Sequence, residues 1–357
     1  MKKIFILMAS AALMLAASCN KMEDVNGPVD TPVETETITV VINPTTKTSL
    51  EGNATVWNKG DKVSVTSSTE HLGYLECIDA EKNIFEGEIV AGKSGAVTLN
   101  YPVDKDNKAV TTVPGTQVAK ENSFAEGAAL LEGTTTVEDL RAGKGASLHN
   151  TTALLKFTVA KAGDVTFEVG STKYTVTGCE TSKNYYACVA PASNVSFVAR
   201  IDGYLSRKAS KNVTFTANII ENLSTLPAPE ECEWGLVGAH QGWSLSKNEL
   251  TKLYKEEDNL FVVKNIKLQS SGFKFTELTN TNWNLTFGSH SSSYVYKASD
   301  GWYAGIYTNN RGDKENDIKV SDWNKTYDVY LRYVQNASWG KELGFAIVEA
   351  GQSYPAL

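Results

Sequence analysis

The chain has few of the residue types on which most enzymes and metal proteins depend. It contains four histidines and five cysteines in 357 residues. The sequence has no His-Glu-x-x-His, Gly-x-Ser-x-Gly or Cys-x-x-Cys spacing, so it gives no support to a zinc site, a serine nucleophile or a redox pair. The adjacent acidic pairs at 230–231 and 256–257 would diverge on a strand and predict no paired glycosidase carboxylates. We therefore expect a non-enzymatic protein that uses no metal and no cofactor.

Positive charge is also in short supply. The chain carries 34 lysines and arginines against 41 aspartates and glutamates, for a formal net charge of −7. Nucleic acids and anionic surfaces are recognised through basic patches, so this balance argues against nucleic acid as a partner. The length exceeds what one hydrophobic core organises and predicts two or more domains.

A long apolar run occurs at the N-terminus. Two lysines precede the apolar segment 4–15, which is too short to span a bilayer and is typical of a secretory signal. The residues before Cys19 resemble a bacterial lipoprotein signal, although Ala16 stands where a large aliphatic residue is usual. The resemblance implies that residues 1–18 are removed and that acylated Cys19 is held by outer-membrane lipid. The alternative is a plain secretory signal with an incidental cysteine.

The next segment, residues 19–36, is polar and contains prolines and a Thr/Glu run. Such a composition cannot bury a core, so we expect a flexible tether. The acidic pair Glu23-Asp24 resembles the surface-export signal of Bacteroidetes lipoproteins. These features imply an outer-membrane protein that is lipid-anchored and faces the cell surface.

From residue 37 onward the sequence predicts strands. Segments such as 37–42 and 154–159 alternate apolar and polar residues, and turn residues interrupt the alternation about every 8–12 residues. We therefore expect an all-β chain of tandem antiparallel β-sandwiches. One helix is expected at 246–254, where a capping box beginning at Ser246 precedes an apolar stripe.

Shifts in composition predict the domain boundaries. Two prolines and two glutamates at 227–231 are incompatible with a central strand. A softer boundary lies at 132–148, where threonines and glycines predict a long loop. The expected domains are two lobes at 37–140 and 141–226, followed by a third domain at 232–357.

Four cysteines remain after Cys19, and export would permit disulfides. Cys179 and Cys188 flank a short stretch that is predicted to connect a hairpin. A cross-strand bridge is geometrically reasonable there. They are the candidate disulfide pair, and free thiols are the alternative.

The first 190 residues of the strand-forming region carry a family resemblance. Thr46-Lys-Thr-Ser-Leu50, followed by Trp57-Asn-Lys-Gly-Asp61, resembles the opening of the fimbrillin-like lipoproteins of Bacteroidetes. The segment 149–159 resembles the first strand of their second lobe, and 218–226 resembles the closing strand. The family implies two transthyretin-like lobes that serve as pilus subunits, anchors or surface modules. Independently of the resemblance, we expect Trp57 to be a core anchor beside a turn.

A second resemblance covers residues 232–350. The Trp-Gly-Leu-Val-Gly run ending at Gly238, the Phe-Lys-Phe run at 273–275 and the Trp-x-x-x-x-Gly run at 283–288 resemble the starch-binding modules of SusE- and SusF-type lipoproteins. The family implies an Ig-like carbohydrate-binding sandwich. The stretch 294–317 is longer than the family pattern, and ligand loops vary most in such insertions.

Tryptophans are concentrated in this third domain. Six of the seven in the chain follow residue 231, in surroundings rich in amides and hydroxyls. They are Trp234, Trp243, Trp283, Trp302, Trp323 and Trp339. Flat apolar rings beside amide groups suit a pyranose, so some rings are expected to face outward; ordinary core and rim packing is the alternative.

The expected carbohydrate site is a subset of these residues. Trp283 and Trp302 are predicted to stack on sugar rings, with Trp243 behind them. Lys274 and Asn282 are predicted to hydrogen-bond to the sugar hydroxyls. Lys274 stands between two phenylalanines and should face solvent, with an ordinary outward lysine as the alternative. Trp234 is expected in the core, and Trp323 and Trp339 in strand-end or loop packing.

Two functions follow from these expectations. The first is a surface lipoprotein that captures an oligosaccharide or a polysaccharide, starch-like or otherwise neutral, and that would work beside an outer-membrane glycan importer. The second is a fimbrial accessory subunit or adhesin whose partners are proteins such as fimbrial subunits. The tripeptide Arg311-Gly-Asp313 could serve as an integrin ligand, but a match of three residues is weakly specific.

Overall fold

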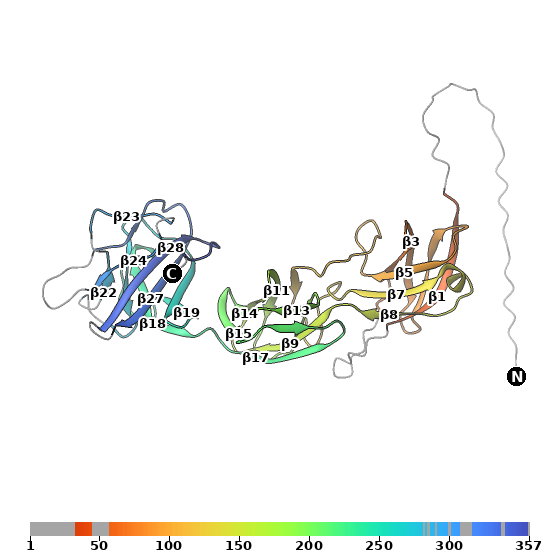
Figure 1. Cartoon of the computed structure of the whole chain (residues 1–357), viewed down its shortest axis with the longest axis horizontal. Coiled ribbons are helices and arrows are strands. Elements are labelled where there is room, and N and C mark those ends of the chain that lie inside the picture. Colours follow the sequence, from red (N-terminus) through yellow and green to blue (C-terminus); the bar gives the residue numbers. More distant parts are fainter. Residues whose placement is uncertain are drawn as a thin grey trace, which may run out of the picture. The chain divides into compact units, whose positions relative to one another are not determined.

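The fold is described from a computed structural model of the chain, drawn in Figure 1. The described residues are 33–44, 57–280, 283, 286–289, 291–298, 301–307, 316–336 and 340–355. Residues Thr35–Leu357 form one compact unit. The signal segment, Cys19 and nearly all of the expected tether lie outside the described residues, as do the run from Thr46 to Leu50, Asn282, the Arg311–Asp313 tripeptide and Trp339.

The first lobe is a closed barrel. Its strands follow one another around the barrel in the order β1-β4-β3-β2-β5-β7-β8, and a parallel pairing of β1 with β8 closes it. The elements are β1 (Thr35–Pro44), β2 (Lys62–Thr66), β3 (His71–Asp79), β4 (Ile84–Val90), β5 (Ala96–Tyr101), β7 (Leu131–Thr136), α1 (Val137–Arg141) and β8 (Ala146–Asn150). Inward residues alternate with outward ones, so the interior fills with apolar side chains. In β4, for example, Phe85 and Ile89 are buried, and Glu86 and Glu88 between them are exposed.

Trp57 anchors this core, as the sequence predicted. Its ring is 3 % exposed and lies edge-on to Phe85 and Tyr101, with centroids 5.0 and 5.2 Å away. Its indole N–H donates to the carbonyl of Ile42 at 2.8 Å, which satisfies the one polar atom the ring brings inside. The Asp61 carboxylate accepts from the backbone N–H of Asn58 and fixes the turn that follows the tryptophan.

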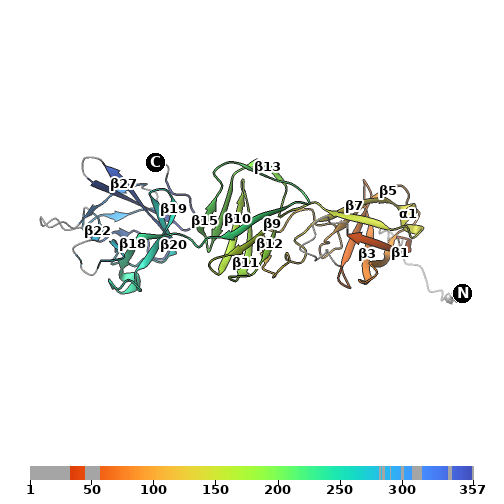
Figure 2. The same ribbon diagram turned by 90° about the horizontal axis from the view of Figure 1, so that it is seen from below.

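The predicted loop at 132–148 is wrong. That segment holds β7, the short helix α1 and β8, and Figure 2 shows α1 beside the barrel strands. Thr136 caps α1 by accepting from the N–H of Asp139. Because β8 pairs with both β7 and β1, the barrel continues past the expected boundary at residue 140.

The second lobe is built from two facing sheets and a small third one. The strand orders are β15-β14-β10-β11-β6, β12-β9-β17 and β13-β16. The elements are β6 (Thr116–Val118), β9 (Ala153–Val159), β10 (Gly163–Val169), β11 (Thr172–Cys179), β12 (Tyr185–Val189), β13 (Ala192–Val195), β14 (Phe197–Ile201), β15 (Tyr204–Lys208), β16 (Val213–Phe215) and β17 (Ile220–Leu226). Strand β6 precedes β7 and β8 of the barrel in sequence yet pairs with β11, so the two lobes exchange chain segments.

The candidate disulfide is not formed. Cys179 and Cys188 are both free, buried thiols. The segment between them does not connect a hairpin, because Cys179 ends β11 of one sheet and Cys188 belongs to β12 of another. The two side chains lie in different apolar clusters, and burial raises the pKa of each thiol to about 12. These cysteines act as small core residues.

The third domain centres on a nine-stranded sheet in the order β24-β28-β27-β20-β19-β18-β21-β22-β25, with a small β23-β26 sheet. The elements are β18 (Glu231–Gly238), η1 (Ala239–Gln241), β19 (Thr251–Glu257), β20 (Leu260–Ile266), β21 (Phe273–Glu277), β22 (Thr286–Gly288), β23 (Val295–Tyr296), β24 (Tyr303–Ala304), β25 (Ile306–Tyr307), β26 (Lys319–Val320), β27 (Tyr327–Asn336) and β28 (Gly340–Glu349). Trp234 is 1 % exposed in its core, which confirms the expectation for that residue.

The helix expected at 246–254 is wrong. Residues 246–250 make a single turn, in which the N–H groups of Glu249 and Leu250 donate to the carbonyl of Ser246. Strand β19 then begins at Thr251 and pairs with β18 and β20. Tertiary pairing outweighs the local helical pattern here. The all-β fold class of the chain is confirmed.

Candidate functional site

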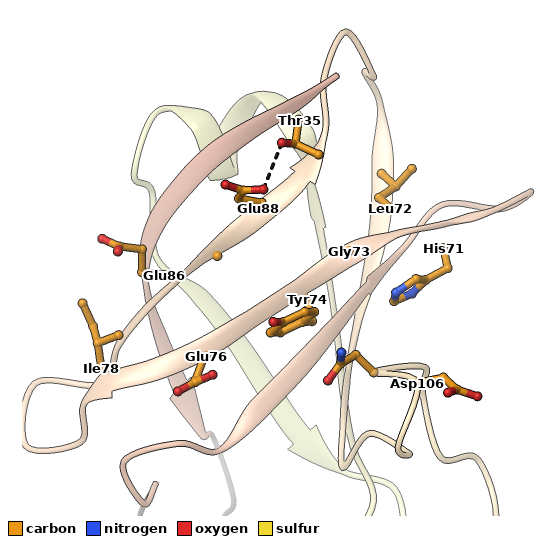
Figure 3. Close-up of a pocket in the computed structure, with 12 residues that line it drawn as sticks. Thr35, His71, Leu72, Gly73, Tyr74, Glu76, Ile78, Glu86, Glu88 and Asp106 are labelled. Atoms are coloured by element: carbon orange, nitrogen blue, oxygen red, sulfur yellow. Dashed lines mark hydrogen bonds between the residues drawn. The ribbon is translucent and has the colours of Figure 1, made fainter. Parts of the chain in front are cut away.

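An acidic groove lies on the outer face of the first lobe (Figure 3). We name it the barrel groove; it has a volume of about 630 Å³ and is formed mainly by β3 and β4. Inward residues of these strands fill the core, so their outward residues line the groove. The acidic ones are Glu76, Glu86, Glu88 and Asp106, and Tyr74 and Ile78 add apolar surface.

Like charges face each other in the barrel groove. Glu76 and Glu86 are directly opposite in the register of β3 and β4, an arrangement that destabilises a sheet. Neighbouring side chains offset part of the repulsion between these two carboxylates. Lys62 lies 3.9 Å from the Glu76 carboxylate, and the Thr39 hydroxyl donates to Glu86. Burial lowers the pKa of His71 at the groove edge, so that imidazole adds no positive charge near neutral pH.

Two glycines allow the strands beneath the barrel groove to approach closely. A Cβ on Gly87 would lie 2.1 Å from the carbonyl oxygen of Tyr74. A Cβ on Gly73 would lie 2.3 Å from the carbonyl oxygen of Glu88, and its φ of +148° is also unusual for other residues. The groove floor is therefore backbone, and its shape requires glycine at both positions.

Two indoles of the third domain lie together on its surface, and we name them the indole pair. The ring centroids of Trp243 and Trp283 are 6.1 Å apart, with planes tilted by 53°. Trp283 is 43 % exposed, and Trp243 packs against a cluster that includes Val237 and Leu250. Trp243 has φ +61°, a left-handed conformation that is rare for a bulky side chain. Such strain is found preferentially at functional sites.

The structure gives the other expected sugar-binding residues different contacts. Trp302 donates its indole N–H to the carbonyl of Pro355 at 3.0 Å and packs on a cluster containing Tyr330. Lys274 stands opposite its buried phenylalanine neighbours, as expected, but its side chain is only 15 % exposed and lies 3.6 Å from the Asp317 carboxylate.

A charged junction connects the second lobe to the third domain. Arg200 of β14 makes a bidentate ion pair with Glu256 of β19, with N–O distances of 2.7 and 2.9 Å. The same guanidinium reaches Glu168 at 3.2 Å, and Lys264 lies 3.4 Å from Glu256. We call these four residues the junction network. No sequence pattern indicates this network, because its members are scattered over almost one hundred positions.

Burial shapes the electrostatics of the junction network. Glu256 is 8 % exposed, and Arg200 and Lys264 are the two cationic partners of its buried side chain. Burial lowers the pKa of Lys264, although Glu256 partly opposes the shift. Burial disfavours the charged Glu168 carboxyl, but Arg200 and Lys173 outweigh this and hold its pKa below the ordinary value. Tyr204 and Tyr254 add an aromatic contact at 4.3 Å across the same junction.

Solved structures of Bacteroides proteins are similar to part of the chain. A candidate cell adhesion protein from Bacteroides ovatus shares 11 % identity and a TM-score of 0.33, covering 53 % of this chain and 91 % of that one. A candidate cell adhesion protein from Bacteroides uniformis shares 11 % identity and a TM-score of 0.31, covering 53 % of this chain and 92 % of that one. A fimbrial protein from Bacteroides ovatus shares 10 % identity and a TM-score of 0.32, covering 56 % of this chain and 52 % of that one.

No family model matches the chain, and no curated protein matches it either. Across the described residues, no helix is long and apolar enough to cross a membrane. The same residues contain no group of three or more histidine, cysteine or acidic side chains arranged to hold a metal ion.

Proposed function

We propose that this chain is a non-catalytic surface protein of the adhesion or fimbrial kind, which contacts protein partners and is held to the outer membrane by lipid on Cys19. The junction network carries the proposal. A surface protein must hold its binding domains steadily against a partner, and a bidentate Arg200–Glu256 pair resists separation of two domains more strongly than a bare linker does.

The barrel groove is the contact surface in this proposal. Its carboxylates face one another without full compensation, so a basic segment of a partner would relieve repulsion that the free barrel sustains. The partly buried ring of Tyr74 and the exposed side chain of Ile78 supply apolar area beside the charges. A groove of this composition fits a protein chain with lysine or arginine and one or two apolar side chains.

Glycan capture is a second candidate, and the indole pair favours it. An exposed Trp283 beside a strained Trp243 offers two ring faces to a neutral oligosaccharide. This candidate would use the third domain alone. It would also make an outer-membrane glycan importer a plausible partner, as the sequence resemblance implies.

Retention of whole cells separates the two functions. Cells that export the chain and cells that lack it are washed over surfaces coated with mixed mucosal proteins or with a neutral polysaccharide. The adhesion proposal predicts chain-dependent retention on the protein coat, weakened by salt because the groove is charged. Retention confined to the polysaccharide coat, and blocked by soluble oligosaccharide, would reject it in favour of glycan capture.

A further inference from the structure

A cleft at one end of the third domain is separate from both surfaces described above. Three loops form it: η1 after β18, the connection from β20 to β21, and the turn between β26 and β27. Its volume is about 580 Å³, which is adequate for a monosaccharide unit. We name it the Trp323 cleft after its most exposed large side chain.

Trp323 departs from the packing role predicted by sequence. Its side chain is 50 % exposed, whereas Trp234 in the same domain is 1 % exposed. The turn beneath the ring is fixed from two sides. The N–H of Asn324 donates to the Asp322 carboxylate at 3.0 Å, and the Tyr327 hydroxyl donates to the Asp322 carbonyl. The indole is therefore held outward on an ordered turn, so little ordering is needed when a ligand binds.

The polar lining of the Trp323 cleft has an unusual charge for this protein. The chain has a net charge of −7, yet the cleft is lined by one lysine and no carboxylate. Lys267 makes no ion pair within the described part of the chain, and its side chain is exposed. Gln269 and Asn324 are also exposed and offer amide donors and acceptors.

His240 forms part of the cleft wall without adding charge. Its Nε2 atom is 3.0 Å from the Thr251 hydroxyl, and burial lowers its pKa. The imidazole is accordingly neutral near pH 7, and Lys267 is the single cation of the cleft. The lining combines one flat apolar face, one ammonium and two amides.

We propose that the Trp323 cleft binds a carboxylated sugar, a hexuronate unit of an acidic glycan, with Trp323 against the ring face and Lys267 at the carboxylate. A neutral sugar would leave the ammonium unused, and an inorganic anion would leave the indole unused. Gln269 and Asn324 are placed to hydrogen-bond with the hydroxyls. The inference does not depend on the protein-adhesion proposal or on the indole pair, because it uses neither surface.

Calorimetric titration of the full chain tests the cleft with two matched probes. One is a trisaccharide of galacturonic acid, and the other is the same trisaccharide with its carboxylates reduced to alcohols. We expect the acidic probe to bind about tenfold more tightly or better, which corresponds to about 1.4 kcal/mol. Lys267→Gln should abolish this preference and leave weak binding of both probes.

Aromatic variants complete the experiment. Trp323→Ala should weaken binding of the acidic probe by about tenfold, and Trp323→Phe should restore part of it, because a ring face is retained. Lys211→Gln, which alters an exposed residue of the second lobe, should change nothing. The proposal is overturned by absence of binding, by equal binding of the two probes, or by insensitivity to both cleft substitutions. Loss of binding with Trp283→Ala alone would likewise reject the cleft and move the site to the indole pair.

Discussion

At the scale of single residues, the tryptophans of this chain differ widely in burial and in their contacts. Trp57 and Trp234 are buried, Trp302 is hydrogen-bonded to the C-terminal segment, and Trp283 and Trp323 are exposed. The sequence identified the two core rings from strand alternation and turn context. It assigned Trp302 to a sugar site and Trp323 to strand-end or loop packing, whereas Trp302 is hydrogen-bonded to Pro355 and Trp323 is exposed. The exposure of each ring depends on which distant segment covers it.

This difference predicts opposite effects of two alanine substitutions. Trp234→Ala should reduce the free energy of unfolding by about 3–5 kcal/mol, because it leaves a cavity in a packed core. Trp283→Ala should change it by less than about 0.5 kcal/mol, since nearly half of that side chain already faces solvent. Denaturant unfolding of the two variants measures both values, and a large loss for Trp283→Ala would mark that ring as structural.

The ion pair at Glu256 gives a second prediction. Glu256→Gln leaves Arg200, whose side chain is only 16 % exposed, without its bidentate partner and should cost about 3–5 kcal/mol. Glu257→Gln is the matched control, because its partner Lys208 is exposed and the pair should contribute no more than about 1 kcal/mol. Equal losses in the two variants would show that the junction network is not the stronger contact.

At the scale of elements, strands were predicted well, whereas the one expected helix was wrong and the short helix α1 was missed. Alternation located most strands because one face of each is buried against a core. The pattern at 246–254 failed because Leu250 and Leu253 satisfy a helical stripe and also the buried positions around β19. The helix α1 was missed because it has five residues and interrupts a segment rich in threonine and glycine.

The close strand approach under the barrel groove gives an element-scale prediction. Gly87→Ala places a methyl group 2.1 Å from the Tyr74 carbonyl, so β3 and β4 must separate. We expect a loss of about 1–3 kcal/mol in the free energy of unfolding. Gly115→Ala is the control, because its nearest neighbour would be 3.6 Å away. Similar stability of the two variants, measured by thermal unfolding, would contradict the described register.

At the scale of the whole molecule, the junction between the second lobe and the third domain was the least predictable feature. The proline-rich segment at 227–231 predicts a linker with few contacts, and the domain beyond it does have its own core. Periodicity cannot show that Arg200 and Glu256 meet, because their pairing is set by the arrangement of two separate sheets. The all-β class was predictable, but this junction and the closure of the barrel through β1 and β8 were not.

Acid should weaken the junction. Arg200 and Lys173 hold the pKa of Glu168 below 4.5, so the unfolded chain takes up the proton first as the pH falls. The contribution of Glu168 is therefore present above about pH 4.5 and lost below it. Melting curves of the full chain and of Glu168→Gln should differ at neutral pH, and the difference should shrink as the pH falls below about 4.5. A difference that persists in acid would contradict this assignment.

Site-specific photo-crosslinking on intact cells tests the central claim most directly. A photoreactive residue replaces Ile78 in the barrel groove, Trp283 in the indole pair, or Val118, which is 70 % exposed outside both surfaces. The account predicts a protein adduct of defined mass from position 78, reduced when Glu86 and Glu88 are changed to glutamine, and no adduct from position 118. Absence of a protein adduct at 78 together with carbohydrate labelling at 283 would contradict it.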